Sequence, residues 1–486
     1  MPARDARGCV GTYWCGTGGR HRRRRGGNAV NEGAPTGPLA SLAGPITTGR
    51  MIEPTSAVRV DLAGKGYLQE EFFAAGTASA FEASGPLGPD GRWSVHPGTG
   101  APYRTRIVVR RPADPDRFNG TVLVEWFNVT GGLEAGPDWT YLSPQIVSDG
   151  YAYVGVSAQA FGVDGGEARI GVPGMAARSG LVASDPARYA TLGHPGDRFS
   201  FDMFTQIGRA LRGPSDPSAL GSLRPRRIVA MGESQSAFFL TTYVDAVQPG
   251  ARVFDGFFVH SRGGSGASLS GTPVGGGDVP SGLQIRNDTS VPVFIFETET
   301  DLGPMLDYVP ARQPDDDRVR TWEVAGTAHG DAYVVGAFAA ALGCDGAVNE
   351  GPQHFVAQAA LVALNRWITD GTPPPTAPPL QLSSQVPPKI ARDDLGNALG
   401  GVRTPLVDVP AATLSGDARP GASPICALFG STVPFDTATL VGLYGGQAGY
   451  LAAFERSLDE AIGAGFLLES DRAELIAQAR SVEFPS

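Results

Sequence analysis

The sequence has no run of about 18 apolar residues, no Cys-x-x-Cys pair and no His-Glu-x-x-His motif. The first absence argues against a transmembrane helix, and the other two argue against a structural or catalytic zinc site. No apolar stretch of about 7–15 residues follows the basic N-terminal residues, so no secretory signal is visible. We therefore expect no membrane partner, no metal and no cofactor, and a cytoplasmic location is favoured over a secreted one.

Cysteine is also scarce, with four residues in 486. Cys9 and Cys15 lie in an N-terminal tail, whereas Cys344 and Cys426 lie where the sequence has a globular pattern. These last two could form a disulfide or stay unpaired in a reducing compartment, and the sequence leaves both possibilities open.

Charge is distributed unevenly along the chain. The net charge is −10, from 39 basic and 49 acidic residues. Residues 1–50 hold eight Arg against Asp5 and Glu32, a balance of +6, so the rest of the chain carries −16. An acidic body repels nucleic acid and anionic lipid. Residues 1–50 lack hydrophobic periodicity, so we expect a disordered Arg- and Gly-rich leader there and no nucleic-acid partner.

Beyond residue 50 the composition is that of a folded protein, with 42% hydrophobic and 18% charged residues overall. Two segments, 67–82 and 102–111, predict an antiparallel pair of strands. Six apolar runs predict buried strands at 121–126, 151–156, 227–231, 254–259, 291–296 and 319–324. Helical patterns such as 200–212 and 236–247 separate several of them. This alternation predicts an α/β protein with a mostly parallel central sheet and helices on both faces.

The pattern divides residues 51–486 into a core and a C-terminal extension. Apolar residues spaced four, four and three apart predict a long helix at 355–370, and Gly371 follows it as a cap. A Pro-rich stretch comes next, and further helices are expected near the C-terminus. We therefore place the core at 51–372, and at 373–486 a Pro-rich crossing and an extension packed on that core.

Two Gly-rich segments with little periodicity, at about 157–199 and 262–290, interrupt the core. Insertions of this kind commonly cover an active site, so we expect lids there. Trp139, Tyr141 and Phe161 are candidate walls of the pocket below, although a place in the ordinary core is the more frequent fate of a Trp or Tyr.

The strongest chemical signal is a Gly-Glu-Ser-Gln-Ser motif centred on Ser234. It lies between a predicted strand and a predicted helix, which is the context of the nucleophile elbow of the α/β-hydrolase fold. Gly232 and Ser236 stand two residues before and after Ser234. Both are small enough to let the strand and the helix approach, although Ser236 replaces the usual glycine. Ser234 is therefore the candidate nucleophile.

A serine hydroxyl needs a base to take its proton, and in this fold the acid and the base follow the serine in chain order. The strand near 291–296 leads to Asp301, just before a Gly-Pro turn. A loop in that position can direct a carboxylate at an imidazole. Asp301 is the preferred acid because it lies farther past the strand than its competitor Glu299.

The base is expected in the Gly-rich loop that follows the last core strand, where the sequence places His329. Of the six histidines, His354 at the start of the long helix is the serious rival. An isolated histidine is more often structural than catalytic. Here its position and the chain order both favour His329.

The predicted chemistry also needs donors for an oxyanion. One should be the backbone N–H of Gln235, directly after the nucleophile, and another should come from the loop after the strand at 121–126. The backbone of Val129 or Asn128 is the candidate in that loop.

The sequence resembles a bacterial family described as "alpha/beta hydrolase domain", whose members mostly lack an assigned substrate. The resemblance spans about residues 55–484. It is carried by the motifs at 124–129, 185–189, 194–197, 232–236, 298–302, 322–329, 403–405 and 407–410. It implies an α/β-hydrolase fold with lid insertions, a C-terminal helical extension and a Ser/acid/His site, but no particular substrate.

The resulting hypothesis is a serine hydrolase that cleaves a small carboxylic ester through an acyl-enzyme. An amidase, a peptidase or an acyltransferase would use the same three residues. A non-catalytic protein that binds a small ligand is a further alternative, which an intact Ser, acid and His argue against. Fold analogy does not identify the substrate, and the sequence leaves acyl length and oligomeric state open.

Overall fold

The computed structural model describes residues 37–55, 60–166, 180–213, 216–272, 277–336, 339, 343–344, 348–419, 421–423 and 425–485. Residues 1–36, most of the leader expected to be disordered, lie outside this set. Residues 37–50 do not fit that expectation, because β1 (Ser41–Ala43) lies among them and pairs with β2 (Tyr67–Ala83). Leu42 is buried in the same hydrophobic core as Phe72 of β2. The predicted boundary at residue 50 is therefore too late in the chain.

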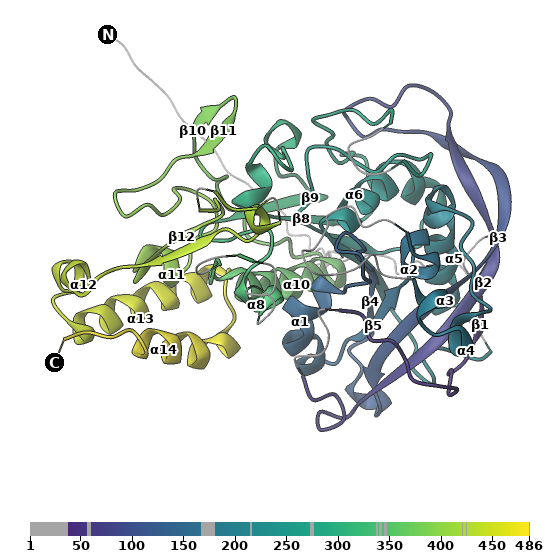
Figure 1. Ribbon diagram of the computed structural model, residues 1–486, viewed down its shortest axis with the longest axis horizontal. Helices are drawn as coiled ribbons and strands as arrows, with labels where there is room; N and C mark the ends of the chain where they lie inside the picture. Colours follow the sequence, from purple (N-terminus) through teal and green to yellow (C-terminus); the bar gives the residue numbers. More distant parts are fainter. Residues whose placement is uncertain are drawn as a thin grey trace, which may run out of the picture. The chain divides into compact units, whose positions relative to one another are not determined.

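The central sheet has nine strands among the described residues, in the order β1-β2-β3-β5-β4-β6-β7-β8-β9. Figure 1 shows β1, β2 and β3 on one side, β4 and β5 in the middle, and β8 and β9 on the side of the C-terminal helices. Six neighbouring strands of this sheet are parallel to one another, namely β5, β4, β6, β7, β8 and β9. Their bounds are β4 Thr121–Trp126, β5 Ala152–Val156, β6 Arg227–Glu233, β7 Gly256–His260, β8 Val293–Thr298 and β9 Val319–Val324. The six buried strands expected from the sequence are confirmed, and so is the mostly parallel sheet.

The remaining strands of the sheet are antiparallel. β2 pairs with β3 (Val95–Pro112) over nearly its whole length, and β3 pairs with β5. The sequence predicted this pair, but it placed the start of β3 at residue 102. Residues 95–101 contain two Gly and one Pro and lack an alternating pattern, so only pairing with the partner strand identifies them as a strand.

Both faces of the parallel strands are buried, which explains their continuous apolar sequences. Val122 and Leu123, consecutive in β4, belong to cores on opposite faces. Helices α5 (Ser200–Arg212) and α6 (Gln235–Thr242) contribute to the first core. Helices α1 (Pro137–Ser148) and α10 (Gln353–Asp370) contribute to the second. Shorter helices are α2 Ala160–Asp164, α3 Leu181–Ser184, α4 Pro186–Tyr189, α7 Gln248–Ala251, α8 Ala332–Val335 and α11 Pro405–Asp408.

Besides α11, the described C-terminal residues form two antiparallel strand pairs and three further helices. Their bounds are β10 Leu382–Gln385, β11 Pro388–Ile390, β12 Ala412–Ser415, β13 Ser431–Pro434, α12 Thr437–Tyr444, α13 Gln447–Ala464 and α14 Arg472–Arg480. Tyr450, Phe454 and Leu458 on α13 lie in the same core cluster as Trp322 of β9. The ring of Phe466 packs edge-on against Trp322, with 5.0 Å between centroids. Apolar side chains thus fasten this region to the second face of the sheet.

Parts of the two expected lids, residues 167–179 and 273–276, lie outside the described residues. Within the first, Leu181 and Tyr189 pack against Phe73 of β2, and Arg188 forms a buried ion pair with Glu71. These contacts attach residues 180–189 to the antiparallel side of the sheet. The covering role of the two segments stays a prediction.

Cys344 and Cys426 form a disulfide, with 5.4 Å between Cα atoms, which settles the pairing that the sequence left open. It links the segment after α8 to the C-terminal region. The adjoining chains also bond directly, because Gly330 N–H donates to Leu428 C=O at 3.0 Å and Asn349 N–H donates to Phe429 C=O at 2.8 Å. The disulfide therefore ties together two segments that flank the loop of His329.

Replacing Cys426 by serine should lower the free energy of unfolding, because the disulfide closes a loop with a sequence separation of 82. Chain entropy alone predicts a loss of about 4–5 kcal/mol for a loop of this length. Denaturant unfolding of the parent and of Cys426→Ser, each with and without reductant, measures the loss. Reductant should destabilise the parent and leave the variant unchanged. Equal stability of the oxidised parent and the variant would contradict the prediction.

Candidate active site

Ser234 stands at a sharp turn between β6 and α6. Its backbone has φ 59° and ψ −121°, a region that side-chain-bearing residues rarely adopt. A Cβ on Gly232 would lie 2.8 Å from the Cβ of Ser236, so the close approach of strand and helix requires glycine there. Ser234 N–H donates to the His260 carbonyl of β7 at 2.9 Å. The turn therefore has the geometry of a nucleophile elbow at the carboxyl edge of the sheet.

The structure brings Ser234, His329 and Asp301 together in one hydrogen-bonded chain. His329 Nε2 lies 2.8 Å from Ser234 Oγ, and His329 Nδ1 lies 2.7 Å from Asp301 Oδ1. Asp301 follows β8 and His329 follows β9, so the ends of three parallel strands supply the three side chains. Asp301 is completely buried, and His329 is 6% exposed.

Thr298 at the end of β8 holds the second oxygen of Asp301. Its N–H and its hydroxyl both donate to Asp301 Oδ2, at 2.6 and 2.7 Å. Both carboxylate oxygens are thereby hydrogen-bonded, which keeps Oδ1 directed at the imidazole. Sequence reasoning missed Thr298, although a threonine three residues before the acid was visible in the sequence.

Opposing effects set the pKa of His329. Burial alone would lower this pKa, but the carboxylates of Glu233 and Asp301 raise it above its ordinary value. The imidazole therefore holds a proton more readily than a buried histidine without acidic neighbours.

The loop after β4 lies beside the elbow, and two of its groups were candidate oxyanion donors. The backbone N–H of Asn128 donates to the Ala135 carbonyl at 2.9 Å, so the prediction for that group is wrong because a β-bridge already uses it. Val129 N–H donates to the side-chain Oε1 of Gln235 at 3.2 Å. Gln235 is the first residue of α6, and a first helical N–H has no partner within its own helix.

A comparison with protein families identifies the family of this chain. The model of the family described as alpha/beta hydrolase domain matches residues 42–477. The chain belongs to this family. A comparison with curated proteins finds no match.

Solved structures similar to this hydrolase include the esterase Est22, at 15% identity and a TM-score of 0.28, covering 48% of this chain and 64% of that one. A carboxyl esterase from Bacillus coagulans is 10% identical with a TM-score of 0.21, covering 33% and 41%. An alpha-beta serine hydrolase homologue from Coxiella burnetii is 10% identical with a TM-score of 0.26, covering 47% and 84%. Similarity this low carries no argument about substrate.

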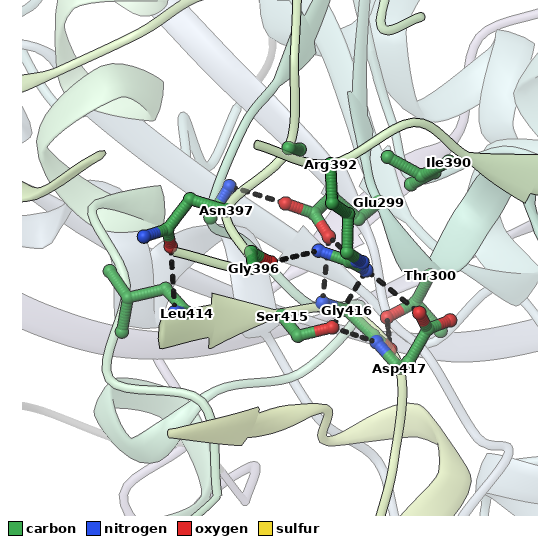
Figure 2. Close-up of polar contacts among 12 residues, drawn as sticks. Glu299, Thr300, Ile390, Arg392, Gly396, Asn397, Leu414, Ser415, Gly416 and Asp417 are labelled. Atoms are coloured by element: carbon green, nitrogen blue, oxygen red, sulfur yellow. Dashed lines mark hydrogen bonds and ion pairs between the residues drawn. The ribbon is translucent and has the colours of Figure 1, made fainter. Parts of the chain in front are cut away.

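Glu299, the competing acid, points away from the imidazole of this hydrolase. Figure 2 shows its carboxylate directed at Arg392, with 3.0 Å between Oε2 and Nη2. It also accepts the N–H of Gly326 at 2.6 Å and that of Gly416 at 3.0 Å. The same Nη2 of Arg392 also forms an ion pair with Asp417 Oδ2 at 2.7 Å. Glu299 thus fastens the C-terminal region to the loops that carry Asp301 and His329.

His354, the rival base, lies at the start of α10. Its ring stacks on Tyr333 of α8 with 3.9 Å between centroids. His329 is the histidine that reaches Ser234, as the distances above show.

The three aromatic residues expected to line the pocket have different environments. Trp139 on α1 is completely buried between Tyr153 and Arg110, so its assignment to the pocket is wrong. It points from α1 onto the sheet, where the apolar face of a helix packs. Tyr141 is also buried, and its hydroxyl donates to Asp331 at 3.2 Å. Phe161 on α2 is half-buried, and its role as a pocket wall stays a prediction.

A second imidazole lies behind the elbow of the hydrolase. His260 is completely buried, and its Nδ1 lies 2.7 Å from Asp138 Oδ1 while its Nε2 lies 3.1 Å from Gln353 Nε2. Burial lowers the pKa of His260 to about 4, so this ring is neutral near pH 7. Its carbonyl accepts Ser234 N–H, and His260 therefore supports the elbow through its backbone.

A cavity of about 540 Å³ lies along β9 and the Pro-rich stretch. Tyr308, Arg312, Thr321, Glu323, Ala377 and Pro378 are among its lining residues. Ser234, His329 and Asp301 are not among the residues that line it, so this cavity is separate from the elbow. Among the residues that the structure describes, no group of three His, Cys, Asp or Glu side chains is placed to hold a metal ion. Nor does this part of the chain contain a helix long and apolar enough to cross a bilayer.

Proposed function

We propose that this hydrolase is a serine carboxylesterase that uses Ser234 as nucleophile, His329 as general base and Asp301 as the acid that orients the base. The observation that carries the proposal is the continuous chain from Ser234 Oγ through His329 to Asp301, with links of 2.8 and 2.7 Å. Those are hydrogen-bond distances, and each atom pairs with the one that proton transfer requires.

The first half of the reaction forms an acyl-enzyme. Asp301 keeps the His329 proton on Nδ1, so Nε2 is free to accept the hydroxyl proton of Ser234. Oγ attacks the ester carbonyl, and the carbonyl oxygen becomes an oxyanion. The C–O bond to the alcohol then breaks, and the imidazolium returns its proton to the leaving alkoxide.

The second half releases the acid. Water gives a proton to His329 Nε2 and attacks the acyl carbonyl, and the second oxyanion expels Ser234 Oγ, which recovers the proton. The backbone N–H of Gln235 is the proposed first oxyanion donor. Val129 N–H is the proposed second donor, provided that substrate displaces the Gln235 side chain that now accepts from it. Each donor of this type contributes about 3–4 kcal/mol to transition-state stabilisation.

The test compares nitrophenyl esters of increasing acyl length with the matched nitroanilides. We expect turnover of the esters with a burst of nitrophenol equal to the enzyme concentration, because the acyl-enzyme accumulates. A higher kcat/KM for the anilides would assign the site to an amidase or peptidase. Binding of the esters without turnover would favour the non-catalytic alternative and contradict the proposal.

A further inference from the structure

Glu233, the residue before the nucleophile, places a second carboxylate against the base. Its Oε1 lies 3.3 Å from His329 Nε2, the same nitrogen that lies 2.8 Å from Ser234 Oγ. The Glu233 side chain is buried, so water screens the interaction poorly. A fourth side chain therefore lies within ion-pair distance of His329, on the nucleophile's side of the imidazole.

Asn128 fixes the position of this carboxylate. Its Nδ2 lies 3.3 Å from Glu233 Oε2 and 3.2 Å from the Glu233 carbonyl oxygen. Asn128 is itself held by paired backbone hydrogen bonds with Ala135, of 2.9 and 2.8 Å. The loop after β4 thus holds the Glu233 carboxylate through Asn128, beside the imidazole of His329.

A neutral His329 imidazole and an ionised Glu233 carboxylate repel each other at this distance, which raises the free energy of the site. Asp301 holds the proton of a neutral His329 on Nδ1, which leaves a lone pair on Nε2. An ionised Glu233 oxygen facing that lone pair is repelled. The repulsion ends when a proton binds either to the Glu233 carboxylate or to His329 Nε2. A proton on the imidazole blocks the transfer from Ser234.

We propose that Glu233 is a positioning residue that acts through His329, setting the pH above which the hydrolase becomes active and stabilising the imidazolium formed during acyl transfer. The proposal rests on the proposed function, because it requires His329 to be the general base. The pKa values agree with the geometry. Burial raises the pKa of Glu233 to about 7, and the Glu233 carboxylate contributes to the raised pKa of His329, against the lowering effect of burial.

Other titratable groups face Glu233 from three further elements. Burial lowers the pKa of His260 on β7 to about 4, so His260 is uncharged near pH 7. Burial raises the pKa of Asp138 and that of Tyr141, both on α1. Asp301, after β8, repels the Glu233 carboxylate and favours its protonated form. None of these groups is a cation near pH 7, so His329, at 3.3 Å, is the group whose charged form an ionised Glu233 stabilises most directly.

Replacing Glu233 by glutamine should move the acid limb of the kcat/KM profile to lower pH. The substitution keeps the shape of the side chain and an oxygen for Asn128, but it removes the negative charge that favours protonated His329. Loss of an opposite charge at this distance shifts a pKa by about 1–3 units. We expect a downward shift of about 1–2 pH units, with a plateau at high pH reduced by up to about tenfold as the imidazolium loses a partner.

The experiment measures kcat/KM for one nitrophenyl ester, and the rate of labelling by a fluorophosphonate, across the pH range in which the protein stays folded. Parent, Glu233→Gln and Glu233→Asp are compared. Glu299→Gln serves as the matched control, because it removes another buried carboxylate that does not reach His329. Both rates should show the same shift for Glu233→Gln, a smaller shift for Glu233→Asp, and none for the control.

An acid limb at the parent's pH in folded Glu233→Gln would overturn the proposal. If that variant does not fold, an unshifted limb in Glu233→Asp overturns it equally. A parent that neither hydrolyses esters nor reacts with the fluorophosphonate would count against the proposed function instead. A parent that does both, beside an unshifted variant, counts against the role of Glu233 alone.

Discussion

Replacing Ser234 by alanine is expected to lower kcat/KM toward a nitrophenyl ester by about 10⁴- to 10⁶-fold. The hydroxyl that lies 2.8 Å from His329 Nε2 is then absent, and no acyl-enzyme forms. Only oxyanion stabilisation and substrate binding remain to accelerate the reaction. Steady-state hydrolysis of the ester, with the burst amplitude measured separately, determines the loss.

Ser236→Ala is a suitable control for this substitution. Ser236 lies two residues away in the same turn, is completely buried, and its hydroxyl has no hydrogen-bond partner among the described residues. Alanine keeps the Cβ that packs against Gly232. We expect this variant to keep most of the activity. A Ser234→Ala variant with activity close to that of Ser236→Ala would contradict the role of Ser234.

Replacing Asp301 by asparagine should lower kcat by about 10⁴-fold. The amide would still accept from Thr298 or contact His329 Nδ1, but it no longer favours the tautomer with the proton on Nδ1 or stabilises the imidazolium. The loss should appear in kcat more than in KM, because the charge develops only in the transition state. Steady-state kinetics of the folded variant measure both parameters.

Glu299→Gln should have the opposite profile, with a large effect on stability and a small one on catalysis. Glu299 is buried and pairs at 3.0 Å with Arg392, which is partly exposed, and leaving a buried polar group without one of its partners costs about 1–3 kcal/mol. Denaturant unfolding measures this loss beside the kinetics. If Glu299→Gln reduced kcat more than Asp301→Asn did, the assignment of the acid to Asp301 would be wrong.

The sequence predicted the parallel part of the sheet well because its strands are buried on both faces. Consecutive residues such as Val122 and Leu123 enter different cores, so each strand reads as an unbroken apolar run. β1 (Ser41–Ala43) could not be recognised in this way. It is three residues long and lies at the edge of the sheet, and it is defined by pairing with β2 rather than by a pattern of its own.

The candidate site was predictable where chain order reflects spatial order. The elbow, the acid and the base each follow a strand of one parallel sheet, so their order along the chain places them at the same edge. Contacts between distant segments, and contacts set by the path of a loop, were not predictable. The Arg392 partner of Glu299 lies 93 residues away in sequence, and the Ala135 carbonyl that occupies Asn128 N–H depends on the path of a loop.

Trp139 illustrates a further limit. A Trp near an expected site can face either the pocket or the sheet, and the hydrophobic pattern of α1 does not distinguish the two. Glu233 illustrates another, because the residue before the nucleophile can point toward the base or away from it. The backbone of the elbow and the loop holding Asn128 decide its direction.

The central claim is that His329 activates Ser234 as a nucleophile. It is tested most directly by treating the folded protein with a fluorophosphonate and locating the adduct by mass spectrometry. The account predicts one adduct per chain, on the peptide that contains Ser234, and at most trace labelling of a folded His329→Gln variant. An adduct on another residue, or equal labelling of the parent and the His329→Gln variant, would contradict it.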